Sequence, residues 1–353
     1  MRRFHRRIHS GRGWFRAAAF TAAVVAASTV PLAAMPAHAA QISCQDLEVP
    51  VSVLGTPQTM YGRLCAPEVA RTVQVLVPGG TYNSTYWDIS YTPEIRSFRL
   101  AMNKAGFATF AVDRLGTGRS SKPLGQLVTA STQAGALHEI VRTLRTGTLG
   151  PRFDKVIIGG HSIGSAMAIT EAGTFHDVDG VLVTGMTHKM NWPTVVPVLA
   201  NMVPAELDPR LAARGLNPGY LTTRADTRFS AFHAPGPEVP EAIRFDESTK
   251  DVFAVTEAMD TTALSTDVLP YSRLIDVPVV IVTGDDRHYC GPPLGSDCSS
   301  AEALRAAEAP HYSAKTRLHA FVLHGYGHSI NYAPHAPSYH RAVATWATTT
   351  VGR

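Results

Sequence analysis

The chain has 353 residues and a formal net charge of +4 at pH 7. The first 39 residues hold six of the 32 Lys and Arg residues and none of the 28 Asp and Glu residues. The remaining 314 residues therefore carry 26 basic and 28 acidic side chains, a net charge of −2, with no dense basic patch. This charge balance argues against nucleic acid and anionic membranes as partners.

The N-terminal segment 1–39 has the organisation of a secretory signal peptide. Arginines precede an apolar run at 17–34, and Ala37-His38-Ala39 forms an A-x-A cleavage site. The apolar run of about 18 residues is marginal for a membrane span, so we expect cleavage near Ala39, no stable membrane anchor afterwards, and a secreted, extracellular protein. Arg2-Arg3-Phe4 is compatible with twin-arginine export.

The first predicted elements after this segment form a two-stranded opening, 47–54 and 59–64, joined by the turn residues Gly55-Thr56-Pro57. Short apolar, β-branched runs then recur and predict further strands. They are 73–77, 107–112, 156–158, 181–183, 277–282 and 318–323. Segments with helical spacing lie between most of them, at 94–105, 132–145, 299–309 and 338–349. This alternation predicts an α/β fold with a mostly parallel central sheet covered by helices on both faces.

The alternation is interrupted once, between residues 186 and 275, where nine prolines lie among short amphipathic pieces without a convincing strand. We expect residues 40–185 and 276–353 to form one core, and 186–275 to form an inserted, mainly helical cap. The phenylalanines of the insertion indicate packing rather than disorder. Its apolar content favours a small hydrophobic ligand for the site that it covers. Nothing in the sequence indicates an oligomeric state.

Four cysteines, an even number, lie beyond the leader, as expected for disulfides in an exported protein. Three pairings are possible. We favour Cys44 with Cys65 and Cys290 with Cys298, because each pair is close in sequence and ties down one local feature. A metal site is the rival interpretation of the cysteines, but neither C-x-x-C nor H-E-x-x-H spacing is present. We therefore expect no metal and no cofactor.

The strand at 156–158 runs into Gly160-His161-Ser162-Ile163-Gly164, which matches G-x-S-x-G, and a helical segment follows at 166–172. This context is typical of a nucleophile elbow, where small flanking residues allow a serine hydroxyl to stand exposed on a sharp turn. The alternative is an ordinary Gly-Ser turn in an α/β protein. The strand before the motif and the helix after it favour a catalytic serine.

A serine nucleophile needs a histidine to accept its proton and a carboxylate to orient that histidine. Asp285-Asp286 follows the strand at 277–282, and His324 and His328 follow the last strand, at 318–323. The chain thus has the order serine, acid, histidine. His324 is the weaker candidate for the catalytic histidine because it stands directly at the end of the strand, so we favour His328.

With these motifs the chain resembles an α/β-hydrolase-fold serine hydrolase, most closely secreted actinobacterial esterase-like members, over nearly the whole region after the leader. The resemblance rests on four segments: 78–82, 113–120, the elbow and 325–328. It implies Ser162 as nucleophile, His328 as general base and acid, and an aspartate of the 285–286 pair as the orienting acid.

The chain departs from the common family pattern where the acid often stands, because Arg287 occupies that position. We favour Asp286, since the Asp-x-x-aromatic-Cys run that it begins is similar to relatives in which this aspartate is catalytic. The resemblance also places the oxyanion hole, the pair of N–H groups that bind developing negative charge, on Ile163 and on Gly80 or Thr81.

The expected function is hydrolysis of carboxylic esters through an acyl-enzyme, without a cofactor. One alternative is a peptidase of the proline-aminopeptidase type, which needs cap carboxylates such as Glu238, Glu241 or Asp246 to hold a substrate ammonium group. Lactone hydrolysis is chemically close to ester hydrolysis and is not separated from it by the sequence. A further alternative, from a different class, is a non-catalytic binding protein with the same fold.

Overall fold

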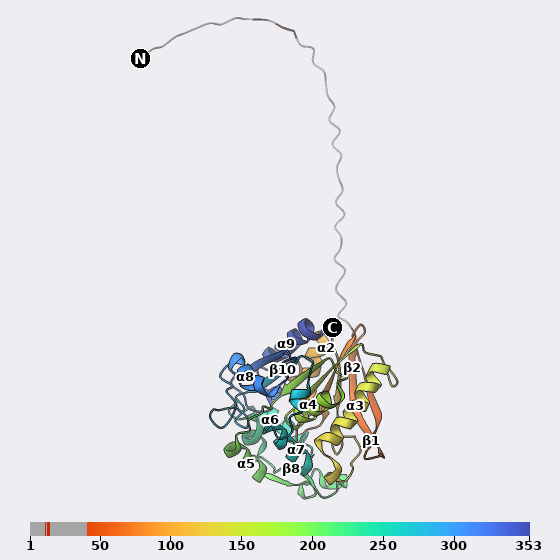
Figure 1. The fold of residues 1–353 in the computed structure, drawn as a ribbon, viewed down its shortest axis with the longest axis vertical. Helices are drawn as coiled ribbons and strands as arrows, with labels where there is room; N and C mark the ends of the chain where they lie inside the picture. The colour runs from red at the N-terminus through yellow and green to blue at the C-terminus, as the bar shows by residue number, and fades with distance from the viewer. Residues whose placement is uncertain (1–10, 12, 15–40) are drawn as a thin grey trace, which may run out of the picture. The chain divides into compact units, whose positions relative to one another are not determined.

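The computed structural model of the protein describes residues 11, 13, 14 and 41–353 (Figure 1). The predicted signal peptide and its cleavage site lie almost wholly outside the described residues. In the part of the chain that is described, no helix is both long enough and apolar enough to cross a membrane.

An eight-stranded sheet forms the centre of the fold, in the order β1-β2-β4-β3-β5-β6-β10-β11. The pairs from β4 to β11 are parallel, whereas β2 is antiparallel to both β1 and β4. The strands are β1 Ile42–Val53, β2 Thr56–Pro67, β3 Thr72–Val77, β4 Ala108–Val112, β5 Lys155–His161, β6 Gly180–Thr184, β10 Val279–Gly284 and β11 Leu318–Leu323. The predicted mostly parallel sheet is confirmed.

The predicted N-terminal hairpin is present, and its strands are longer than the sequence suggests. Val53 pairs with Thr56, so only Leu54 and Gly55 form the turn. Both residues have positive φ, 48° and 81°, as a two-residue turn matching the strand twist requires. Thr56 and Pro57 therefore belong to β2 and not to the turn.

Helices cover both faces of the sheet because the inner strands are apolar on both sides (Figure 1). Along β5, Val156 and Ile158 pack with α3 and α4 in one core cluster, whereas Ile157 packs with α2 and α9 in the other. The helices are α1 Pro93–Arg96, α2 Phe98–Lys104, α3 Ala130–Thr146, α4 Ile163–Phe175, α8 Ala301–Glu308 and α9 Pro337–Trp346. The predicted helix 94–105 is divided because the Ser97 side chain accepts the Leu100 N–H and begins α2.

The insertion after β6 contains helices and a small antiparallel sheet, so the expectation that it has no strand is wrong. Its helices are α5 Trp192–Ala200, α6 Pro240–Ser248 and α7 Val255–Ser265. Its strands, in the order β7-β8-β9, are β7 Met202–Pro204, β8 Tyr220–Thr223 and β9 Phe253–Ala254. Strands of two to four residues are too short to show an alternating pattern in the sequence. Leu264 of α7 joins the same core cluster as α3 and α4, so the last part of the insertion packs as a core helix.

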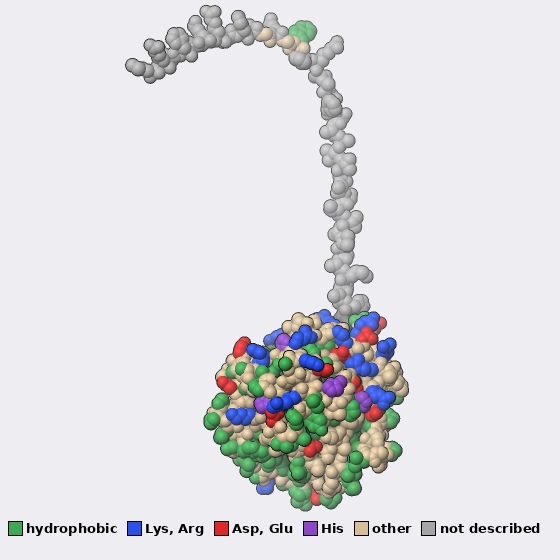
Figure 2. Space-filling view, viewed as in Figure 1, with side chains coloured by type: hydrophobic (Ala, Val, Ile, Leu, Met, Phe, Trp, Pro, Cys, Tyr) green, Lys and Arg blue, Asp and Glu red, His purple; other side chains and the backbone are tan. Residues whose placement is uncertain are grey.

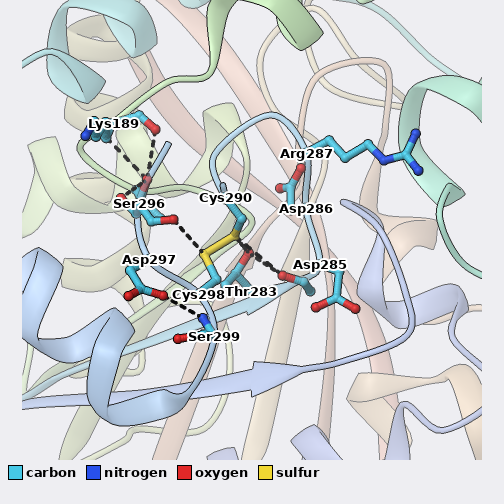
Figure 3. The surroundings of a disulfide bond; sticks show 12 residues. Lys189, Thr283, Asp285, Asp286, Arg287, Cys290, Ser296, Asp297, Cys298 and Ser299 are labelled. Carbon is cyan, nitrogen blue, oxygen red and sulfur yellow. Dashed lines mark hydrogen bonds between the residues drawn. A yellow bond between two sulfur atoms is a disulfide. The ribbon is translucent and has the colours of Figure 1, made fainter. Parts of the chain in front are cut away.

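Two disulfide bonds, Cys44–Cys65 and Cys290–Cys298, are present in the structure, in the pairing favoured by sequence. The first joins paired residues of β1 and β2. The second closes the loop that follows β10, beside Asp285 and Asp286 (Figure 3). The covalently closed segment, 290–298, thus begins four residues after Asp286.

Candidate active site

Ser162 lies at the sharp turn between β5 and α4. Its backbone has φ 55° and ψ −124°, a conformation that costs energy for a residue with a side chain. Its N–H donates a hydrogen bond of 2.8 Å to the Thr184 carbonyl of the neighbouring strand β6. The turn is thus held in the strained shape that presents the serine side chain at the carboxyl edge of the sheet.

The glycines on either side of Ser162 are required by close backbone contacts. A Cβ at Gly160 would lie 2.2 Å from the Gly164 carbonyl oxygen, and one at Gly164 would lie 2.5 Å from the Val77 carbonyl oxygen. Neither position accepts a larger residue without a backbone shift. The G-x-S-x-G pattern therefore reflects the sterics of this elbow.

The His328 ring is held by a buried carboxylate. Its Nδ1 lies 2.6 Å from Oδ2 of Asp286, which is fully buried. Burial raises the pKa of Asp286, but the neighbouring rings of His328 and His288 and the hydrogen bonds to this carboxylate outweigh burial, and the pKa lies below its ordinary value. Asp286 is consequently ionised at neutral pH and fixes His328 with its Nε2 on the other side of the ring.

The other candidate acid and histidine, Asp285 and His324, lie together at the surface. Asp285 accepts the Gly325 N–H and lies 2.9 Å from Nδ1 of His324, and all three residues are exposed or partly exposed. Figure 3 shows the carboxylates of Asp285 and Asp286 apart from each other. The structure thus brings Asp286 and His328 together and pairs Asp285 with His324 in a surface turn.

Ser162 and His328 line the same cavity. Among the described residues, the Ser162 hydroxyl makes no hydrogen bond, and its side chain is partly open to the cavity. Catalytic hydrogen bonds of this kind are often long in the absence of substrate and tighten when it binds. The Ser162 hydroxyl is therefore free to approach the carbonyl carbon of a bound ligand. His328 lies in the wall of the same cavity.

The predicted oxyanion residues Gly80, Thr81 and Ile163 line this cavity as well. Ile163 is the first residue of α4, where a helix leaves its N–H groups without internal partners. In the described part of the chain the N–H groups of Gly80 and Thr81 donate no hydrogen bond. Three backbone N–H groups of residues that line the cavity thus have no described hydrogen-bond acceptor.

The loop that carries Gly80 and Thr81 is held from three directions. The Arg114 guanidinium donates to the Gly79 carbonyl (3.1 Å), and the Asp251 N–H donates to the Thr81 carbonyl (2.8 Å). Arg228 of the cap donates to the Thr81 hydroxyl (3.0 Å). Thr81 has φ 62°, an uncommon value for a threonine, and these contacts keep it there.

The cap also holds the loop of His328. The N–H of Ser329 donates to the Phe232 carbonyl (2.8 Å), and the N–H of Gly327 donates to the His233 carbonyl (3.1 Å). Phe232 and His233 belong to a π-helical turn, Phe229–His233. The residues on both sides of His328 are therefore fixed by one segment of the cap.

The cavity has a volume of about 520 Å³ and a predominantly apolar wall. Its lining from the cap comprises Met190, Trp192, Val195, Val198, Leu199, Met202, Leu221, Phe232, Phe253, Val255, Ala258, Met259, Thr261 and Thr262. Among the described lining residues none is Asp, Glu, Lys or Arg. Hydrophobic side chains gather on the outer surface over α5 and β8, in the lower left of Figure 2. The cavity is suited to a neutral, apolar ligand.

Sequence reasoning missed His288, a second histidine beside the acid. The backbone N–H of His288 donates to Oδ1 of Asp286 (3.0 Å), and the centre of its ring lies 5.0 Å from the centre of the His328 ring. Burial is the main cause that lowers the pKa of His288 to about 4, so this ring is neutral at neutral pH. The Asp-x-His spacing after the strand was the available signal.

Sequence reasoning also missed a buried ionic cluster in the cap. Arg228 makes two hydrogen bonds to Asp246 (2.7 and 2.8 Å), and Nε2 of His233 lies 2.8 Å from the same carboxylate. All three side chains are fully buried. No local sequence motif predicts this cluster, because its members are separated in sequence and meet only in the folded cap.

The group Asp286, His288 and His328 has ligand atoms within 4.8 Å of one another, a spacing compatible with a metal ion. The Asp286 carboxylate, however, already pairs with Nδ1 of both rings. These residues thus have mutual partners without a metal.

The comparisons with known proteins agree with this architecture. The sequence profile described as "Alpha/beta hydrolase family" matches residues 74–341. The chain matches none of the curated proteins with which it was compared.

Solved structures with the same fold include carboxylesterase CesB (YbfK) from Bacillus subtilis, with a TM-score of 0.57 and 15% identity over 86% of this chain and 91% of that one. They also include the alpha/beta hydrolase GrgF from Penicillium sp. sh18, with a TM-score of 0.56 and 17% identity over 88% and 100% of the chains. A thermophilic esterase from Thermogutta terrifontis has a TM-score of 0.53 and 16% identity over 87% and 99%. These similarities concern the fold, and the match over residues 74–341 shows that the chain belongs to the alpha/beta hydrolase family.

Proposed function

We propose that the protein is a serine hydrolase that cleaves carboxylic esters with an apolar acyl or alcohol group. The observation that carries the proposal is Ser162, on a strained elbow, facing the same cavity as His328, whose Nδ1 is bound by the buried Asp286. Esterases among the structures with the same fold support the reaction class.

In the proposed reaction the Ser162 hydroxyl oxygen attacks the ester carbonyl carbon, and Nε2 of His328 takes the hydroxyl proton. The oxyanion of the tetrahedral intermediate accepts hydrogen bonds from Ile163 and from Gly80 or Thr81, each worth about 3 kcal/mol. The carbon–oxygen bond then breaks, and His328 gives its proton to the leaving alcohol. Asp286 stays ionised and stabilises the protonated ring throughout.

The second half of the reaction releases the acid. A water molecule gives a proton to His328 as its oxygen attacks the acyl carbon, and collapse of the second intermediate returns that proton to the Ser162 oxygen. All steps use side chains and backbone groups of the chain, together with water. The apolar, uncharged cavity wall provides a place for the hydrophobic part of the substrate.

The aminopeptidase alternative finds no support in the described cavity. Glu238 and Glu241 are exposed on the cap, and Asp246 is fully buried in its pairs with Arg228 and His233. None of the three carboxylates lines the cavity. A substrate ammonium group would therefore have no counter-charge there.

We further propose that the protein is secreted and resembles the secreted actinobacterial members of the family. The two disulfides are compatible with an extracellular, oxidising environment. The signal peptide at 1–39 stays a prediction from sequence, as does its export route.

A fluorophosphonate probe tests the proposed nucleophile. We expect the purified protein without its leader to take up one equivalent of probe, with the modified peptide containing Ser162, and to hydrolyse p-nitrophenyl esters. Ser162→Ala is expected to take up none, whereas Ser230→Ala, a change at an exposed hydroxyl of the cap, is expected to label fully. A folded wild-type protein that neither labels nor hydrolyses esters would instead favour the non-catalytic binding role. Efficient turnover of lactones over linear esters would move the proposal to that substrate class.

The size of the cavity is tested at Ala258, which lies on α7 and lines it. In Ala258→Trp an indole fills part of the apolar volume, so kcat/KM for p-nitrophenyl esters with long acyl chains is expected to fall about tenfold or more, because one lost methylene contact in a pocket changes rates about 10- to 200-fold. Hydrolysis of the acetate ester serves as the internal control and is expected to stay within a few-fold. An equal loss on all chain lengths would contradict the assignment of this wall to the acyl group.

A further inference from the structure

The cap helix α5 is apolar on nearly all sides, yet the protein does not enclose it. Its sequence, Trp-Pro-Thr-Val-Val-Pro-Val-Leu-Ala, carries no charged residue, and each of its nine residues is at least partly exposed. A helix that is apolar all round is normally buried. The side chains of α5 instead form part of the cavity wall on one side and meet solvent on the other, where hydrophobic side chains gather in Figure 2.

Five large apolar side chains of α5 and α7 are open to solvent. On α5 the exposed fractions are 41% for Trp192, 55% for Val196 and 46% for Leu199, and on α7 they are 41% for Val255 and 64% for Met259. Spacings of three and four residues place each set on one face of its helix. All except Val196 also line the cavity, so these side chains stand where the cavity opens. We call the five residues the mouth patch.

The mouth patch is uncharged, and the acidic residues of α7 are engaged elsewhere. Glu257 is fully buried against Arg114, and the Asp260 carboxylate accepts the Ala130 N–H (2.8 Å). Anionic membranes attract clusters of Lys and Arg, and the sequences of α5 and α7 contain neither residue. Apolar area without charge fits an uncharged apolar phase instead. Tryptophan, as at position 192, is a residue type that settles at the boundary between such a phase and water.

The position of the mouth patch decides what can cover it. Apolar residues that gather around a binding site mark a contact surface, unlike single ones scattered over a protein. A second copy of the chain or another folded protein seated there would close the opening through which a substrate reaches Ser162. A layer of aggregated ester molecules would cover the same side chains and deliver substrate at the opening.

We propose that the mouth patch docks the protein on the surface of an aggregated, uncharged ester, such as a neutral lipid droplet, and that the ester enters the cavity from this surface. The inference rests on the proposed ester hydrolysis and adds the physical state in which the substrate is met. Docking is driven by the apolar area that the patch removes from water. It is therefore expected to persist at high salt concentration, which screens attraction between charges.

Flotation measures docking without turnover. Ser162→Ala, prepared without the leader, is mixed with a triolein emulsion coated with phosphatidylcholine, and the bound fraction is determined after centrifugation. We expect Ser162→Ala to float with the droplets at low and at high salt. Ser162→Ala/Val196→Asp is expected to bind at least about tenfold more weakly, because burial of one valine side chain changes an equilibrium by about that factor. Val196 does not line the cavity, so the cavity itself is unchanged.

Val69→Asp in the Ser162→Ala background is the matched control. Val69 is 80% exposed and precedes β3, so it lies at the amino edge of the sheet, whereas Ser162 lies at the carboxyl edge. We expect this control to float as Ser162→Ala does. The Tm of all three proteins is expected to be similar, because both valines are exposed and surface substitutions change stability little.

Kinetics with the intact serine connects docking to turnover. Val196→Asp and the wild type are expected to hydrolyse dissolved p-nitrophenyl acetate at the same rate. On a tributyrin emulsion, Val196→Asp is expected to be at least about tenfold slower at low droplet concentration. Its rate should approach that of the wild type when more droplet surface is supplied, since the variant loses docking and keeps kcat.

Several results would overturn the inference. Flotation only when phosphatidylserine is added to the coat would indicate a charged membrane as the partner. Equal flotation of Ser162→Ala and Ser162→Ala/Val196→Asp, or no flotation of either, would exclude the patch as the docking surface. A wild-type dimer in sedimentation equilibrium that Val196→Asp dissociates, in place of flotation, would assign the patch to a second copy. Flotation as expected without any ester hydrolysis by the wild type would contradict the proposed function and leave the docking supported.

Discussion

Replacing Asp286 with asparagine is expected to lower kcat for ester hydrolysis about 10⁴-fold, the loss typical of a triad whose acid is made neutral. The Asp286 carboxylate accepts from His328 Nδ1 at 2.6 Å in a fully buried position. An amide there no longer stabilises the protonated ring and favours the wrong tautomer of the histidine. Steady-state kinetics on a p-nitrophenyl ester measures the change.

Asp285→Asn is the matched control for this prediction. Asp285 is adjacent in sequence, but its carboxylate binds the Gly325 N–H and His324 at the surface. We expect kcat to stay within a few-fold of the wild type. If instead Asp285→Asn abolished activity and Asp286→Asn retained it, the assignment of the orienting acid would be reversed.

The fold was largely predictable because its signals are local. The apolar runs of β3, β4 and β11 and the elbow between β5 and α4 each lie within a few consecutive residues. Buried parallel strands are apolar throughout, and a strand followed by G-x-S-x-G leaves few alternatives. The small sheet of β7, β8 and β9 was missed, because two to four residues carry no periodic pattern.

The position of the candidate site residues at one edge of the sheet could be predicted for a similar reason. Ser162, Asp286 and His328 each follow a strand of the sheet, and the carboxyl edge of a parallel sheet brings such residues together. Arg228, His233 and Asp246 lie within the irregular insertion, and their pairing depends on how its short segments pack. Contacts made only by tertiary packing leave no local signal.

Removal of Asp246 is expected to have the largest effect on stability. Asp246→Ala leaves the guanidinium of Arg228 fully buried without a counter-charge, and breaking a buried ion pair in this way costs about 3–5 kcal/mol. Domains have a total stability of about 5–15 kcal/mol, so the midpoint of urea unfolding should fall markedly. Arg228 also donates to Thr81, and His233 belongs to the turn that holds the His328 loop. The variant should therefore lose activity under conditions where it is still folded.

Two further variants separate charge burial from simple loss of a side chain. Glu241 lies on the same helix α6 and pairs with Arg244 in an exposed position, so Glu241→Ala is expected to change the unfolding midpoint little. The double variant Arg228→Met/Asp246→Leu removes both charges, and replacing a buried pair by apolar residues is often neutral. We expect it to be more stable than Asp246→Ala alone. If the double variant is the less stable of the two, the uncompensated arginine is not the source of the loss.

The acid sensitivity of the protein provides an independent check of this cluster. Burial raises the pKa of Asp246, but Arg228 and His233 outweigh it and lower the pKa to about 2, below the ordinary value of 3.8. The folded state therefore holds this group ionised more strongly than the unfolded state does, and its contribution is fully present above pH 4 and is lost as the pH falls towards 2. The free energy of unfolding of the wild type should fall across this interval by about 2 kcal/mol more than that of Asp246→Asn, which has no carboxyl group to titrate there. If the free energies of unfolding of the two proteins fell equally with pH, the Asp246 carboxylate would not be stabilised by its partners.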